Sequence, residues 1–232
     1  MIKSKNDYYY YLEADRIALS RKKTKSFDLR SKLKEWLFPD YIWEFQKTLR
    51  KLEYLKNTPS AFANRLVYFL VLRKYHRLSF KLGFAIPVNV FGPGLSIAHY
   101  GAIIINARAK VGANCRLHAG VNMGTEAGYS DKVPLLGDNI YIGPGAKLFG
   151  AITIANNVAI GANAVVNRSV EEENIAIGGI PAKKIADHID IDDLLIRATM
   201  ILTLKMDTDA LAGMPAKKMK EFLENKKHNE RE

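Results

Sequence analysis

The 232-residue chain contains a single cysteine and no long apolar run, and each of these features excludes a class of protein. One cysteine, Cys115, excludes an internal disulfide framework. The longest uninterrupted apolar run, Leu66 to Leu72, is far below the ~20 residues that span a bilayer. The N-terminal residues also lack the apolar stretch of a signal peptide. We therefore expect a cytoplasmic protein.

Acidic residues are scarce in the N-terminal third. Residues 1–80 hold 18 Lys and Arg against 8 Asp and Glu, so this third carries +10 of the net charge of +11. No recognised nucleic-acid motif accompanies the charge, so we expect no nucleic-acid partner. Because the basic residues mix with Tyr, Trp and Phe, two interpretations stay open. They form either the solvated face of a helical region or a peripheral contact with anionic lipid at the inner face of the membrane.

Aliphatic residues recur every six positions between Ile105 and Val170. One row holds Ile105, Val111, Leu117, Met123, Leu136, Ile142, Leu148, Ile154, Ile160 and Val166, and a second row, four places later, holds Ala109, Cys115, Val121, Ile140, Ala146, Ile152, Val158, Ala164 and Val170. Neither a helix nor a strand has a period of six. A hexapeptide repeat does, and it predicts a mainly β protein, a triangular parallel β-helix in which three hexads make one coil.

The pattern divides the chain into three parts. Residues 1–85 are predicted to be a basic α-helical region, 86–185 the β-helix and 186–232 a helical C-terminal tail. Within the first part, apolar spacing predicts a helix over 36–55, and Ser60 is placed to cap a second helix that runs to about Phe80. In the tail, residues 187–206 have the amphipathic pattern of a helix.

Two irregularities in the repeat carry the chemistry. His99 lies six residues before Ile105, where an inward aliphatic residue is expected. It is either a satisfied core or corner histidine or a general base, since neutral imidazole accepts a hydroxyl proton near pH 7. The second irregularity is the 13-residue step from Met123 to Leu136, one more than two hexads. The polar segment inside it is predicted to project from a corner and to line a binding site.

Several segments together resemble the serine acetyltransferase family over roughly residues 86–185. The segments that carry the resemblance are His99–Ile105, Asn122–Thr125, Ile142–Gly150, Ile160–Val166 and Ile177–Lys183. The resemblance implies a left-handed β-helix and a homotrimer, with a dimer of trimers as an alternative. It also implies acetyl-CoA as co-substrate, bound between neighbouring coils, and no metal. His99 matches the catalytic histidine of the family.

The acceptor side departs from the family pattern. The family carries an Asp directly before the catalytic histidine, where this chain has Ala98, and an Arg-His-Pro in the projecting loop, where this chain has Lys132, Val133 and Pro134. A lysine is a weaker partner for a carboxylate than a bidentate arginine. The pattern is similar to the serine acetyltransferase-like proteins of capsule and exopolysaccharide pathways. We therefore expect O-acetylation of a sugar hydroxyl; the alternatives are serine O-acetyltransferase activity in cysteine biosynthesis and a non-catalytic trimeric scaffold.

The remaining candidate residues fall into two groups. The first group could act in catalysis or bind the acceptor, whether that is a small molecule or a glycan. Each of its members could instead have only a structural role, in corner packing or in a solvated loop. The group contains His118, Tyr100, Asn122, Glu126, Asp131 and Lys132. Those that the resemblance assigns to acetyl-CoA are Gly124, Pro144, Ala162, Gly179, Pro181, Lys183 and Lys184. The two lysines can meet nucleotide phosphates as point charges or form a solvated edge.

Overall fold

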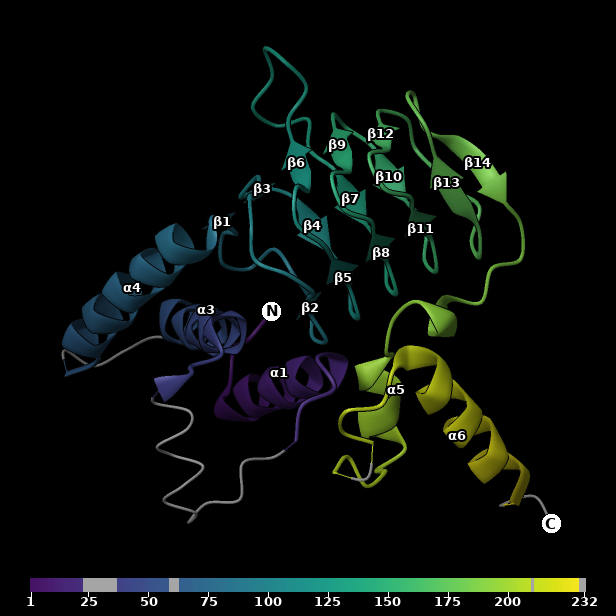
Figure 1. Cartoon of the computed structure of the whole chain (residues 1–232). Coiled ribbons are helices and arrows are strands. Elements are labelled where there is room, and N and C mark those ends of the chain that lie inside the picture. Colours follow the sequence, from purple (N-terminus) through teal and green to yellow (C-terminus); the bar gives the residue numbers. More distant parts are fainter. Residues whose placement is uncertain (23–36, 59–62, 210, 230–232) are drawn as a thin grey trace.

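A computed structural model describes residues 1–22, 37–58, 63–209 and 211–229 of the chain. A bundle of N-terminal helices leads into a prism of short strands, and C-terminal helices fold back against the bundle (Figure 1). The helices are α1 (Lys5–Ala18), α3 (Tyr41–Asn57), α4 (Ala63–Leu82), the 3-10 turn η1 (Ile191–Asp193), α5 (Ala198–Thr203) and α6 (Ala216–Asn229). None of these helices is long and apolar enough to cross a membrane within the described residues.

The described residues 84–186 form the three sides of the prism. Sheet A contains β1 (Phe84–Ala85), β3 (Ile103–Ile105), β6 (Asn122–Gly124), β9 (Lys147–Phe149) and β12 (Val165–Val166). Sheet B contains β4 (Lys110–Val111), β7 (Leu135–Leu136) and β10 (Thr153–Ile154). Sheet C contains β2 (Ser96–Ile97), β5 (Arg116–Leu117), β8 (Tyr141–Ile142), β11 (Ala159–Ile160), β13 (Ala176–Gly178) and β14 (Lys183–Ala186). All pairs are parallel except β13 with β14, which closes the end of the prism.

The six-residue repeat is confirmed as the core of the prism. Every residue of the first row, from Ile105 to Val166, is at most 6% exposed. The second row is buried as well from Ala109 to Ala164, and Val170 packs against it half-buried. Cys115 lies inside this core, where burial raises the pKa of its thiol, so it is an apolar core residue.

The prediction that His99 takes an inward position is wrong. Ile97 is the inward residue of that side, because it pairs with Leu117 in the next coil. Ile97 and Ile105 are eight residues apart, whereas their partners Leu117 and Met123 are six apart. Two additional residues therefore enlarge the corner between β2 and β3. His99 lies in that corner and is exposed.

The long step from Met123 to Leu136 is also explained by the register. Ile105 pairs with Met123 and Val111 with Leu136, and Ile105 and Val111 are only six residues apart. The 13-residue step therefore contains one hexad and seven additional residues at one corner; no hexad is skipped. The insertion projects from the upper edge of the prism after β6 (Figure 1).

Helix boundaries differ from the prediction in two places. Helix α3 begins at Tyr41 rather than at 36, because the side chain of Asp40 caps it by accepting from the N–H of Trp43. Ser60, the predicted cap of the next helix, lies outside the described residues. The predicted helix over 187–206 is instead the turn η1 followed by the six-residue helix α5.

A buried ionic cluster joins the helices to the prism. The guanidinium of Arg50 donates to both carboxylate oxygens of Asp15, at 2.8 and 3.1 Å, and to Glu53 at 3.0 Å. It also donates to the carbonyls of Phe91 and Gly92 at the start of the prism. Burial alone would lower the pKa of Arg50, but the two carboxylates raise it above its ordinary value. The cluster therefore ties α1, α3 and the first coil together.

A ladder of asparagines follows the edge between sheets B and C. Asn114, Asn139 and Asn157 all have positive φ, between +56° and +58°, which asparagine tolerates better than most residues. The amide of Asn114 donates to that of Asn139, and Asn139 donates to Asn157, each at 2.8 Å. At the open end, Thr199 of α5 both accepts from and donates to Asn114. The C-terminal segment is thereby fixed to the side of the prism.

Replacing Arg50 should strongly destabilise the protein. We expect Arg50→Met to lower the free energy of unfolding by about 3–5 kcal/mol, because Asp15 and Glu53 would remain buried without their counter-charge. Lys56→Ala, an exposed change on the same helix, should stay within about 0.5 kcal/mol of the native protein. Urea denaturation followed by circular dichroism measures both; equal stability of the two variants would contradict the role given to the cluster.

Candidate functional site

One edge of the prism brings both candidate histidines together with Tyr100, Pro144 and Ala162. This edge, which we call the histidine edge, consists of the corners between sheets C and A, residues 98–102, 118–121, 143–146 and 161–164. Successive corners are hydrogen-bonded: Gly120 N–H donates to Ala102, Gly145 to Ala119 and Asn163 to Pro144. Gly120 has φ of +81°, and a Cβ there would lie 3.1 Å from Gly145. The chain can therefore stack its corners closely at this edge.

His99 and His118 lie next to each other on the first two corners. Their ring centroids are 5.9 Å apart, and the His118 ring also lies 5.2 Å from that of Tyr141. His99 is exposed, whereas His118 is half-buried and its Nε2 is shielded from solvent with no partner among the described residues. Burial, and then the positive charges of Arg116 and His99, lower the pKa of His118, so its neutral form is favoured.

The residues matched to acetyl-CoA continue along the same edge. Pro144 lies in the third corner and Ala162 in the fourth, while Gly179 and Pro181 follow β13 at the end of the edge. With ~4.8 Å per coil, four steps from His99 to Gly179 cover roughly 19 Å. The histidine edge can therefore present an elongated surface with the imidazoles at one end. Gly124 is the exception, since it ends β6 away from this edge.

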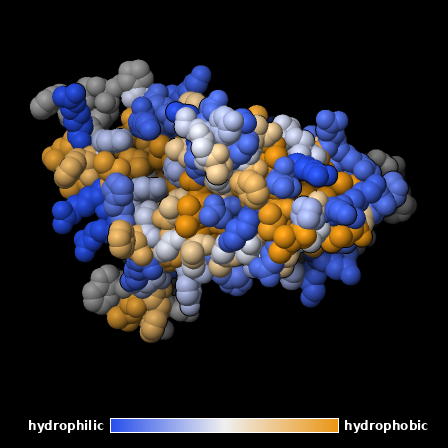
Figure 2. Space-filling model, turned by 90° about the horizontal axis from the view of Figure 1, so that it is seen from above, coloured by the Kyte–Doolittle hydropathy of each residue, from blue (hydrophilic) through white to orange (hydrophobic). Residues whose placement is uncertain are grey.

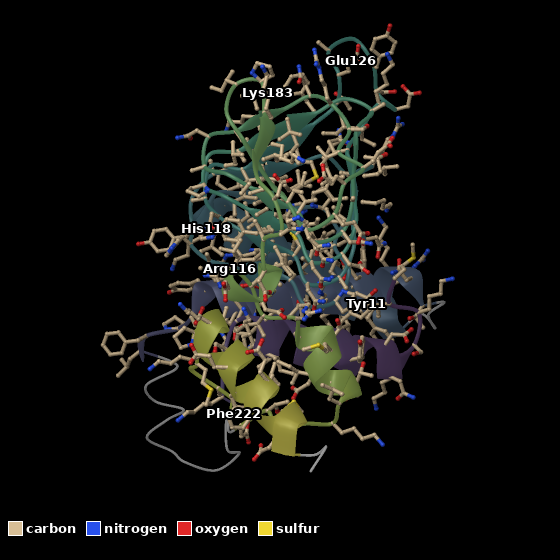
Figure 3. All side chains as sticks on the ribbon, turned by 90° about the vertical axis from the view of Figure 1, so that its right-hand side faces the viewer. Tyr11, Arg116, His118, Glu126, Lys183 and Phe222 are labelled. Carbon is tan, nitrogen blue, oxygen red and sulfur yellow. The ribbon has the colours of Figure 1, made fainter. Side chains whose placement is uncertain are left out.

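Lys183 and Lys184 lie at the far end but differ in their surroundings. The ammonium of Lys184 is 3.0 Å from Glu172 and 2.7 Å from Asp187, and both carboxylates raise its pKa. Lys183 is exposed and forms no ion pair with a described carboxylate. Of the two, Lys183 is therefore the lysine whose charge is not neutralised by a described carboxylate, and Figure 3 shows where it lies.

The loop residues do not reach the histidines within one chain. Glu126, Asp131 and Lys132 belong to the inserted corner between sheets A and B, and Figure 3 shows Glu126 well apart from His118. Lys132 pairs with Glu126 at 3.0 Å and lies over the ring of Tyr129, 3.4 Å from its centroid. Within this chain, Glu126 and Asp131 therefore do not orient His99.

The other two acceptor-side candidates are placed differently. Tyr100 is 74% exposed in the enlarged corner, so its hydroxyl is open to a ligand. Asn122 begins β6, and its backbone N–H already donates to the carbonyl of Ala146. That N–H is therefore engaged in the sheet and is not free to bind a ligand.

Arg116 is a functional candidate that the sequence alone did not single out. It lies on the outer face of β5, two residues before His118, and pairs in register with Ser96 of β2. Its charge contributes to the lowered pKa of His118, so the two groups are close. Together with Ser96, Ala98, Ser20 and Arg21, it lines a cavity of about 370 Å³ between the prism and the ends of α1 and the tail.

The arrangement favours acid–base chemistry at an exposed imidazole. A neutral histidine beside an open corner can accept a proton from a hydroxyl that approaches it. Arg116 places a positive charge near that position, which suits a carboxylate on the bound molecule. No group of His, Cys, Asp and Glu in the described part of the chain is arranged to hold a metal ion.

Sequence comparisons identify relatives of the chain. No family model matches. A serine acetyltransferase of Synechococcus elongatus is 33% identical over 135 residues, which cover 53% of this chain and 55% of that protein. A serine acetyltransferase of Helicobacter pylori is 32% identical over 120 residues, which cover 51% of this chain and 70% of that protein. The match thus spans about half the length of the first relative and more than two thirds of the second.

Solved structures share the fold. The serine acetyltransferase of Brucella abortus in complex with coenzyme A superposes with a TM-score of 0.61 at 22% identity, covering 79% of this chain and 69% of that one. The enzyme of Neisseria gonorrhoeae gives 0.60 at 23% identity, covering 81% and 69%. The prism is therefore the predicted left-handed β-helix, flanked by N-terminal helices and a C-terminal helix. Because the Helicobacter pylori enzyme is 32% identical to the chain and the match covers 70% of that enzyme, the chain belongs to the serine acetyltransferase family of hexapeptide-repeat acetyltransferases.

Proposed function

We propose that the chain is an acetyl-CoA-dependent O-acetyltransferase with His99 as general base. The observation that carries the proposal is the exposed imidazole of His99 in an enlarged corner, beside a half-buried His118, in a chain of this family. The acetyl donor would lie along the histidine edge. Its thioester would be near the imidazoles and its phosphates near Lys183.

The proposed reaction is a direct transfer in a ternary complex. His99 accepts the proton of the acceptor hydroxyl while the oxygen forms a bond to the thioester carbonyl carbon. The carbon–sulfur bond then breaks, and the departing CoA thiolate takes the proton from His99. No covalent intermediate on the enzyme is needed, and proton and charge balance over the two steps.

His118 is assigned a positioning role. Its lowered pKa favours the neutral form, so His118 adds little positive charge beside His99. Its Nε2 is shielded from solvent and has no hydrogen-bond partner among the described residues, so a ligand could bond to it only if the corner moved. The Asp that precedes the histidine in the family is replaced by Ala98, so the chain would activate His99 without it.

The complete site is proposed to form between subunits of a trimer. The inserted loop and the histidine edge occupy different corners of one prism. In a closed ring of three copies, the loop corner of one copy can face the histidine edge of the next, because such an interface joins two different surfaces. Glu126, Asp131 and Lys132 would then line the acceptor pocket of a neighbouring copy.

The comparisons favour L-serine as the acceptor over a sugar. The relatives at 32–33% identity are serine acetyltransferases, and they give no support to the expected capsule branch. Arg116 is placed to receive the carboxylate of serine in place of the missing loop arginine. A sugar hydroxyl remains the second candidate because Lys132, the nearest counterpart of that arginine, is already paired with Glu126.

The first test is acetyl transfer itself. With L-serine and acetyl-CoA, we expect the native chain to release CoA, and His99→Ala to lower kcat/KM about 10²–10⁴-fold, the contribution of a general base. His76→Ala, an exposed histidine on α4, should retain native activity. A parallel screen of saccharides by mass spectrometry identifies an acetylated sugar if serine is not used. Native turnover by His99→Ala would disprove the mechanism.

A second pair of variants separates the two candidate acceptors. If serine is the acceptor, Arg116→Ala should raise the KM for serine about tenfold or more, since a hydrogen bond to a charged group is lost. Lys132→Ala should change it less, because Lys132 is occupied by Glu126. The KM for acetyl-CoA serves as the internal control. The reverse order of effects would place the carboxylate at the loop instead of at β5.

A third pair tests the donor end. Lys183→Ala should raise the KM for acetyl-CoA about fivefold, as expected for ~1 kcal/mol of an exposed charge interaction. Lys184→Ala removes the same charge, but its pairs with Glu172 and Asp187 leave less of it for a phosphate. Steady-state kinetics with acetyl-CoA varied compares the two. Equal effects would mean that the phosphates do not distinguish these lysines.

A further inference from the structure

Helix α4 is the part of the chain that neither the core nor the histidine edge accounts for. Its 20 residues include five Lys and Arg and no Asp or Glu. Of its described side chains, 65–82, only Leu78 and Leu82 are buried. Both lie in its last turns, where the helix meets the prism. Residues 65–72 in the first half of the helix are therefore exposed or half-buried, and none of them is buried.

One face of this helix carries apolar residues in its first turns and basic residues in the turns that follow. Leu66, Phe69 and Leu70 lie near its start and are 67%, 61% and 56% exposed. Arg73 and Arg77 follow at spacings of three and four, so they continue the same face. We call these five residues the α4 patch. In Figure 1 the start of α4 is the end farthest from β1, so the apolar part forms a projecting tip.

The surface around α4 also combines apolar and charged groups. At the end of the molecule where α4 lies, Figure 2 shows strongly hydrophobic and strongly hydrophilic groups side by side. Isolated exposed apolar residues are common on proteins, but several together on one projecting element indicate an interaction surface. The partner must accept large aliphatic and aromatic side chains together with guanidinium groups.

We propose that the α4 patch docks on an anionic lipid surface. A helix of this kind lies in the interface, with apolar side chains among the acyl chains and basic residues at the headgroups. Two α4 helices packed face to face would bring like positive charges together, so charge disfavours that form of self-association. Nucleic acid would satisfy the arginines but leave the tip exposed. Lipid satisfies both halves of the patch.

Flotation with vesicles tests the proposal on the full chain. The native protein should float with vesicles of phosphatidylcholine and phosphatidylglycerol, but not with phosphatidylcholine alone, and added salt should weaken the binding. Arg73→Gln with Arg77→Gln should lower the partition coefficient about 30-fold, from about 1 kcal/mol per basic residue. Leu66→Ser with Phe69→Ser should abolish the salt-resistant part of the binding.

Two matched controls carry the same chemical changes on α6. Lys217→Gln with Lys218→Gln removes two exposed charges, and Phe222→Ser removes a part-exposed aromatic ring; both should float like the native protein. Failure of the native chain to bind anionic vesicles, or equal binding by the α4 variants, would refute lipid docking.

Sedimentation velocity without lipid tests the competing occupant. If the apolar variant reduces the size of the assembly, the patch is an interface between copies and the lipid proposal is wrong. Should the apolar variant fail to fold by circular dichroism, the arginine pair decides alone, because Arg73 and Arg77 are fully on the surface.

Discussion

The structure depends on the buried guanidinium of Arg50. It is one group with five donors, and it is shared among a helix at the start of the chain, the helix that carries it and the first coil of the prism. Asp15 extends the link by accepting from the N–H groups of Gly94 and Leu95, just before β2. The strand that leads to His99 is therefore held in place by charge buried outside the prism. The stability of the helical bundle and the position of the imidazole depend on the same contacts.

The sides of the prism form its core, whereas its corners carry the solvent-exposed groups that can meet a ligand. The sides repeat, because each hexad must place aliphatic residues into one continuous core. The corners face solvent and carry the exposed histidine, the close-packed glycines and the inserted loop. The half-buried His118 shows how a corner can also tune chemistry: burial and two positive charges favour its neutral form, while its neighbour stays open to solvent.

The repeat made the core predictable, since period and burial follow from the same geometry. The place of His99 was not predictable in the same way. Ile103 lies six residues after Ile97, so the sequence alone allows a corner of normal length, with Ile103 as the next inward residue. Only the pairing of Ile105 with Met123 shows that Ile105 holds that position and that the corner has two additional residues. The cluster around Arg50 was hidden for another reason: its partner Asp15 is 35 residues away, beyond any local pattern. Arg116 likewise became a candidate only once the fold placed its charge near His118 and its side chain in the wall of the cavity.

The enlarged corner has an evolutionary consequence. The two residues added before β3 and the seven added after β6 leave the inward rows and the strand pairing of the next coils unchanged. Length at a corner is therefore nearly neutral for folding, while it decides which groups meet a ligand. A lineage built on this prism can therefore change the groups that meet a ligand by insertion and deletion at a corner, and differences in corner length between relatives would record such changes of specificity.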